Sequence, residues 1–172
     1  MSTTSTIDIA ALLPDLQRLV KDLHGDLNDR LREHPEIDAK LRADAYTPVE
    51  QGGRTAQAYE VWRDDYLEQV AVAWVLACVF VRYMEDNDLI VGTYLAGLTP
   101  DRRRQADDAH AAYFQVHPRD SDREYLLDVF RRVGSIPAAR DLFAEGKTPL
   151  WALGPTADGA RALLDAWRKI DP

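Results

Sequence analysis

An unbroken run of apolar residues, Val70 to Val81, constrains the fold of this chain more than any other feature of its sequence. The run is longer than the 4–8 residues typical of a strand and shorter than the roughly 20 residues needed to cross a membrane. Alanine and leucine are mixed among its valines, and Arg82, Glu85 and Asp86 follow it. This pattern predicts a helix at about residues 66–86 that is buried on all faces.

A helix that is apolar all round requires amphipathic helices to cover it, and the rest of the sequence supplies them. Apolar residues recur at helical spacing of three or four over four further stretches, about residues 12–31, 99–117, 121–134 and 156–170. No stretch shows the sustained alternation of a strand. The sequence therefore predicts an all-α fold: one helical domain, residues 1–172, with about seven or eight helices bundled around the buried central helix.

Short motifs predict where several of these helices begin and end. Residues 47–50 (TPVE) and 121–124 (SDRE) have the form of capping boxes, in which the first side chain and the fourth satisfy free amides of the first turn. Gly134 is expected to end its helix in a left-handed conformation. Pro137 is expected to open a further short helix.

Charge, cysteine content and the N-terminal sequence limit the classes of function. The net charge of −8 argues against a protein that coats nucleic acid, because neutralising phosphates dominates such affinity. The single cysteine, Cys78, lies in the apolar run and rules out a disulfide framework. Residues 1–11 lack the basic start and apolar stretch of a signal peptide. We therefore expect a cytoplasmic protein.

Signatures of catalysis are absent from the sequence. It contains no Walker A loop, no dinucleotide-binding glycine motif, no nucleophile elbow and no metal-binding cysteine or histidine pairs. We therefore predict no catalytic, cofactor-binding or metal-ligating residue in this chain.

Two groups of arginines stand out in this acidic chain: Arg102, Arg103, Arg104, Arg131 and Arg132. Such clusters can contact phosphate or an acidic partner surface. The alternative is a pair of solvated helix faces balanced by neighbouring aspartates, namely Asp101, Asp107, Asp108 and Asp128. A different role is expected for Arg82, because its spacing predicts an ion pair with Glu85 or Asp86 one helical turn away.

The segment from Val75 to Ile90, VLACVFVRYMEDNDLI, carries a resemblance to a known family. It resembles the N-terminal segment of the PglX-type adenine-specific DNA methyltransferases of phage-exclusion systems (BREX and phage growth limitation). The residues that carry the motif are Phe80, Arg82, Glu85, Asp86 and Asn87. Further matching stretches follow in the expected order, at residues 53–56, 111–114, 117–120, 149–151, 160–164 and 167–168.

The resemblance implies a parent protein that transfers a methyl group from S-adenosylmethionine to the N6 atom of adenine in DNA. The Asn/Asp-Pro-Pro-aromatic motif that holds the flipped base in that family is absent here, as is the glycine-containing cofactor loop. The resemblance therefore implies a non-catalytic N-terminal scaffolding or interaction domain that binds no cofactor itself.

The partners that the resemblance implies are the methyltransferase domain of the same protein and other phage-defence proteins. DNA is expected to bind only weakly or through the parent protein, and no membrane is involved. The alternative hypothesis is a stand-alone small helical protein that binds nucleic acid or regulates a defence enzyme in trans.

Overall fold

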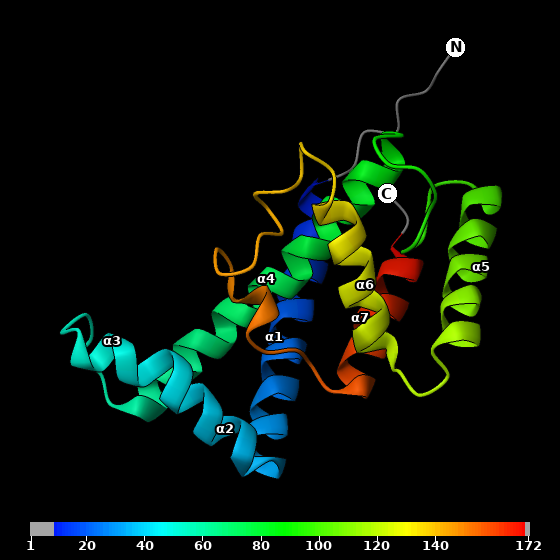
Figure 1. Ribbon diagram of the computed structural model, residues 1–172. Helices are drawn as coiled ribbons and strands as arrows, with labels where there is room; N and C mark the ends of the chain where they lie inside the picture. The colour runs from blue at the N-terminus through cyan, green and yellow to red at the C-terminus, as the bar shows by residue number, and fades with distance from the viewer. Residues whose placement is uncertain (1–8, 171–172) are drawn as a thin grey trace.

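The computed structural model describes residues 9–170, and every regular element in that range is helical (Figure 1). The elements are α1 (Ile9–Glu33), α2 (Pro35–Leu41), the π-helical turn η1 (Arg42–Tyr46), α3 (Thr47–Gln51), α4 (Tyr59–Asp86), α5 (Pro100–Val116), α6 (Asp122–Gly134), the 3-10 turn η2 (Pro149–Trp151) and α7 (Ala157–Lys169). The all-α prediction is confirmed. Residues 1–8, on which part of the signal-peptide prediction rests, and residues 171–172 lie outside the described range.

The number of helices is slightly below the predicted seven or eight. Residues 35–51 run continuously through α2, η1 and α3, so the described part of the chain holds six separate helices. This continuity also corrects the capping box predicted at residues 47–50. The Thr47 hydroxyl donates to the carbonyl oxygen of Arg42 at 3.0 Å, as it does inside a helix, and it caps no new one.

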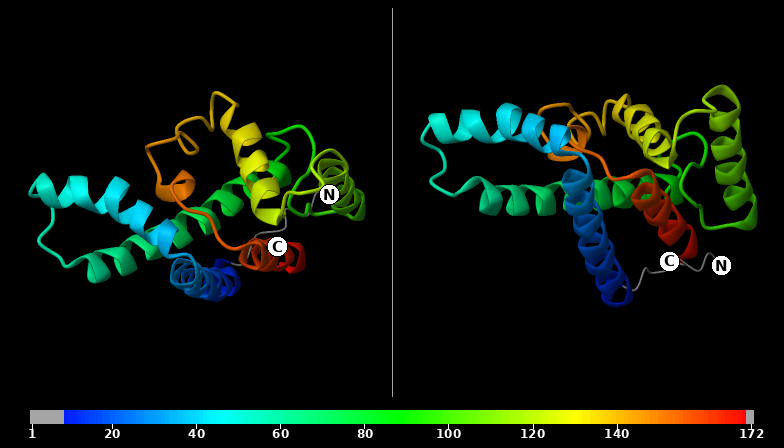
Figure 2. Two further views of the ribbon diagram at one scale, coloured as in Figure 1. Left: turned by 60° about the horizontal axis from the view of Figure 1, so that its bottom comes forward. Right: turned by 90° about the horizontal axis from the view of Figure 1, so that it is seen from below.

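Helix α4 is the axis around which the other helices are arranged. It contacts α1, η1, α6 and η2, while α7 packs against both α1 and α6. The run from α2 to α3 projects at one end of α4, and α5 stands near the other end (Figure 2). The predicted central helix is therefore present, although it begins at Tyr59 and is longer than expected.

The core lies along one side of α4. Leu67, Val70, Trp74 and Val81 are fully buried there. The Trp74 ring meets the ring of Phe130 from α6 edge to face, with centroids 5.4 Å apart, and its indole N–H donates to a backbone carbonyl after η2. Trp74 therefore joins α4 to two other segments through both its apolar face and its polar atom.

The prediction that α4 is buried on all faces is wrong. Val72, Leu76 and Phe80 keep 36%, 44% and 37% of their surface exposed. Their spacing of four residues places them in one row along the helix. Helix α1 and the segment after α6 flank this row without covering it.

Helix α4 is also the one helix of the described residues that is long and apolar enough to cross a membrane, by length and composition alone. More than half of its most apolar stretch, 56%, is buried inside the protein. The core helix of a soluble protein passes the same test, and the contacts of α4 fit that description.

Helix α6 confirms one boundary prediction and corrects two. The backbone N–H of Ser121 donates to the Glu124 carboxylate at 2.9 Å, so the capping box is present. Gly134 ends α6 without a positive φ; it is needed because an added Cβ would lie 2.8 Å from the Cβ of Phe143. Pro137 begins a series of turns rather than a helix.

The contrast between the buried and exposed sides of α4 gives a stability test. We expect Trp74→Ala to lower the free energy of unfolding by about 3–5 kcal/mol, as for other emptied aromatic sites. The matched change on the exposed row, Phe80→Ala, should cost about 1 kcal/mol. Urea denaturation measures both. Equal losses in the two variants would show that Phe80 is as buried as Trp74.

Candidate functional site at the end of helix α4

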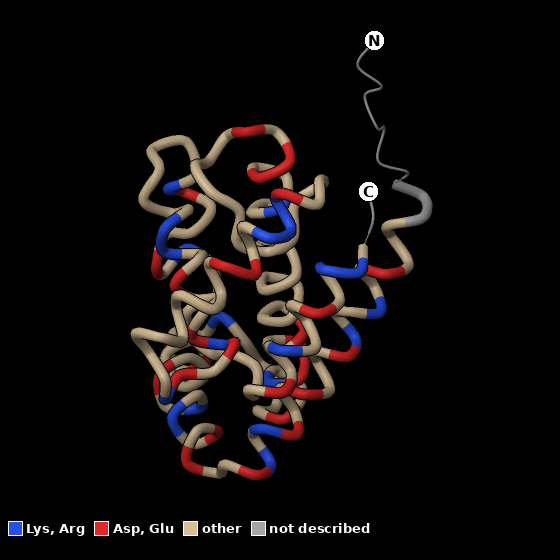
Figure 3. Tube along the Cα trace, turned by 90° about the vertical axis from the view of Figure 1, so that its right-hand side faces the viewer, with Lys and Arg blue, Asp and Glu red and all other residues tan. Residues whose placement is uncertain are grey.

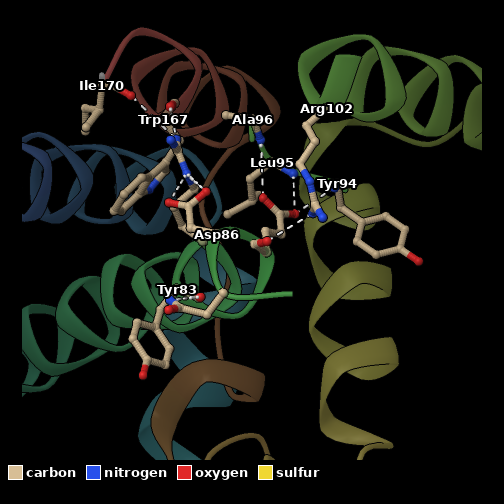
Figure 4. Close-up of polar contacts among 11 residues, drawn as sticks. Tyr83, Asp86, Tyr94, Leu95, Ala96, Arg102, Trp167 and Ile170 are labelled. Carbon is tan, nitrogen blue, oxygen red and sulfur yellow. Dashed lines mark hydrogen bonds and ion pairs between the residues drawn. The ribbon is translucent and has the colours of Figure 1, made fainter. Parts of the chain in front are cut away.

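The last turn of α4 carries a buried carboxylate that organises the loop after it. Glu85 has no exposed surface. Its Oε1 atom accepts hydrogen bonds from the backbone N–H groups of Tyr94 at 2.6 Å and Leu95 at 2.9 Å, and its Oε2 atom accepts one from Ala96 at 3.5 Å (Figure 4). The three amides are consecutive in the loop between α4 and α5. One side chain therefore satisfies a stretch of buried backbone that no helix pairs.

Burial shapes the acidity of this carboxyl group. Loss of hydration raises the pKa of Glu85, while the three backbone donors and the Arg82 guanidinium act in the opposite direction. A carboxyl group with no exposed surface has no access to a substrate. We therefore assign Glu85 a structural role.

Arg82 links the ends of α4 and α7. Its Nε atom donates to both carboxylate oxygens of Asp86, at 3.0 and 2.8 Å, which confirms the ion pair expected from their spacing. The two side chains are only 7% and 8% exposed. A terminal nitrogen of Arg82 also reaches the carbonyl oxygens of Trp167 and Ile170, at 3.4 and 3.5 Å. The arginine therefore satisfies carbonyls left unpaired at the end of α7.

Arg102 closes the cluster from α5. It donates to the carbonyl oxygen of Glu85 at 3.0 Å and forms an ion pair with Asp88. The loop passes close to this arginine, because a Cβ on Gly97, whose φ is +78°, would lie 2.4 Å from the Cβ of Arg102. Arg102 was predicted as a phosphate or partner contact, and the structure places it in internal contacts with α4 and its loop.

The other arginines of the two groups lie on exposed helix faces. Arg104 pairs with Asp101, Arg132 pairs with Asp128 at 2.6 Å, and Arg131 lies over the ring of Trp151 at 5.3 Å. Arg103 is exposed next to Arg104 on α5. Basic and acidic positions are interleaved along the chain in Figure 3. These pairs fit the alternative of balanced helix faces, and contact with phosphate or a partner stays a prediction.

The five residues of the resemblance motif have two different placements. Arg82, Glu85 and Asp86 belong to the buried cluster, and the side chain of Asn87 donates to the carbonyl oxygen of Tyr83 at 2.8 Å as α4 ends. Phe80 instead lies in the exposed row. The sequence signal for the cluster was the arginine directly after the apolar run, with an acidic pair three and four residues further on. The loop amides that donate to Glu85 could not be identified from spacing.

Two grooves border the exposed row of α4. One has a volume of about 720 Å³ and lies between this row and the segment after α6, which contributes Leu142, Pro149 and Leu150. The other, of about 570 Å³, lies between the row and α1. Both are lined mainly by apolar side chains. Within residues 9–170 no group of three or more histidines, cysteines and acidic residues could hold a metal ion.

These features define a class: a helical domain braced internally by a buried ion pair and a buried carboxylate, with an apolar face exposed on its central helix. The chain is similar to the adenine-specific methyltransferase PglX of Streptomyces coelicolor, with 39% identity over 165 residues, or 96% of the chain. The chain spans only 14% of the length of that protein. It thus resembles one domain of PglX, as the segment Val75–Ile90 predicted. No family model matches the chain, and no solved structure does.

The structural role of Glu85 can be tested by hydrogen exchange. Glu85→Ala leaves three backbone donors without an acceptor, and each buried one costs about 1–3 kcal/mol. We expect faster exchange at the amides of Tyr94, Leu95 and Ala96, measured by NMR. Glu85→Gln keeps an oxygen where Oε1 stands and should preserve protection at Tyr94 and Leu95. Unchanged protection in the alanine variant would contradict the assignment.

Proposed function

We propose that this chain is a non-catalytic interaction domain of a larger protein resembling a site-specific adenine-N6 DNA methyltransferase, and that the parent protein acts in phage defence. The similarity to PglX carries the proposal, because it extends over almost the whole chain and yet over a small part of that protein. S-adenosylmethionine would be bound by the remainder of the parent, since the sequence here has neither the base-holding motif nor the cofactor loop.

The role of the domain is to pack against the methyltransferase part of the parent and to dock other phage-defence proteins. Its exposed apolar row supports this role. Val72, Leu76 and Phe80 form a contiguous apolar surface with grooves on both sides, and such surfaces mark sites of protein interaction.

Contact with DNA belongs to the parent protein in this proposal. The net charge of −8 opposes binding to a polyanion, and Arg104 and Arg132 are each paired with an aspartate. Any DNA contact by this domain is therefore weak and independent of sequence. A protein that modifies cellular DNA works in the cytoplasm, and no membrane takes part.

The proposal can be tested with the Streptomyces methyltransferase from which the similar segment has been removed. The isolated chain should form a complex with the trimmed enzyme in size-exclusion chromatography with light scattering. Titration with S-adenosylmethionine serves as a control, because a folded trimmed enzyme should still bind the cofactor whereas the isolated chain should not.

The intact methyltransferase is the matched control. The isolated chain should not bind it, because its own segment would occupy the docking position. Failure of the isolated chain to form a complex with a trimmed enzyme that still binds the cofactor would contradict the proposal. Saturable cofactor binding by the isolated chain would equally contradict its non-catalytic character.

A further inference from the structure

We propose that the groove between α4 and the segment after α6 binds an amphipathic helix with basic residues at one end. This inference rests on the proposed function, because it assigns that helix to the methyltransferase polypeptide.

The shape of the groove fits a helix. Val72, Leu76 and Phe80 form one wall over about 12 Å, at 1.5 Å per residue. Leu142, Pro149 and Leu150 form the facing wall. Two small residues of α4, Ala73 and Ala77, also line the groove, so the backbone of a bound helix can approach closely. Apolar side chains at a spacing of three or four would then fill the space between the walls.

The charge at one end of the groove determines which charge the end of the bound helix should carry. Asp65 and Glu68 lie at the end nearer the start of α4. Within residues 9–170 neither carboxylate is in an ion pair with a lysine or arginine, although Lys21 of α1 lines the neighbouring groove together with Glu68. Asp65 accepts only a neutral amide, from the side chain of Gln57 at 3.1 Å. At the opposite wall Asp141 is already neutralised by Lys147 at 2.6 Å. The lining of this groove thus carries a net negative charge, with Asp65, Glu68 and Asp141 against Lys147, and this charge favours lysine or arginine on the partner.

The same charge disfavours two other occupants. A second copy of this chain would bring its own Asp65 and Glu68 to the contact, and like charges brought together oppose association. A membrane surface that carries anionic lipids would be repelled in the same way. A basic amphipathic helix has an apolar side that matches the walls of the groove and a positive charge opposite to that of Asp65 and Glu68.

The test uses a synthetic 20-residue helix, with leucines at a spacing of three and four and lysines at one end, and a matched peptide in which glutamates replace the lysines. Fluorescence anisotropy should show saturable binding of the basic peptide alone. Leu76→Glu should weaken it by about tenfold or more, as for a central contact. Val116→Glu, at a site on α5 that is 73% exposed, is the matched control and should bind the basic peptide as the unsubstituted chain does.

Glu68→Lys tests the charge without disturbing the core, because Glu68 is exposed. It should weaken binding of the basic peptide and allow the acidic one to bind. Equal binding of both peptides by the unsubstituted chain, or equal losses of peptide affinity in Leu76→Glu and Val116→Glu, would overturn the inference. An unsubstituted chain that sediments as a dimer and becomes a monomer on Leu76→Glu would also overturn it, in favour of a second copy.

Failure of the groove can be told apart from failure of the proposed function. If Leu76→Glu binds the trimmed methyltransferase as well as the unsubstituted chain does, the interaction role stands and the groove assignment is wrong. If the unsubstituted chain does not bind the trimmed enzyme, the proposed function is wrong, and so is the assignment of the helix to the methyltransferase.

Discussion

Burial of the apolar run of α4 is the interaction on which the rest of this structure depends. Trp74 and Val70 have no exposed surface, and each such side chain contributes about 1.5–3 kcal/mol when fully buried. This gain fixes α1, α6 and η2 against α4. It also excludes water around the end of the helix, so the backbone of the loop before α5 and of the end of α7 needs internal partners there. Glu85 accepts hydrogen bonds from the loop amides and Arg82 donates to the carbonyls of α7, so charged side chains are buried inside an apolar assembly.

The incompleteness of that burial connects the fold to the proposed role. One row of α4, centred on Leu76, is apolar and yet lies between grooves rather than beneath another helix. A basic segment that covered it would bury this row and offset the net negative charge of the groove lining. The similarity to a segment of a much longer methyltransferase indicates where such a chain would come from. Stability and the proposed interaction thus depend on opposite sides of the same helix.

The sequence predicted those features that depend on local spacing. The length of the run that ends at Val81 indicated a helix, and the capping box at Ser121 and the ion pair of Arg82 with Asp86 were both confirmed. The exposure of Phe80 could not be predicted, since a run without polar residues carries no information about which face is outward. The contacts of Glu85 were equally hidden, because they join segments that only the folded chain brings together. No local pattern marks such a pairing.

The central claim is that the exposed row of α4 is covered by the methyltransferase polypeptide in the assembled protein. Hydroxyl-radical footprinting of the chain, alone and in complex with the trimmed Streptomyces methyltransferase, tests it directly. We expect the side chains of Leu76 and Phe80 to lose reactivity in the complex while that of Val116 does not. A complex in which Leu76 and Phe80 remain as reactive as in the free chain would contradict it.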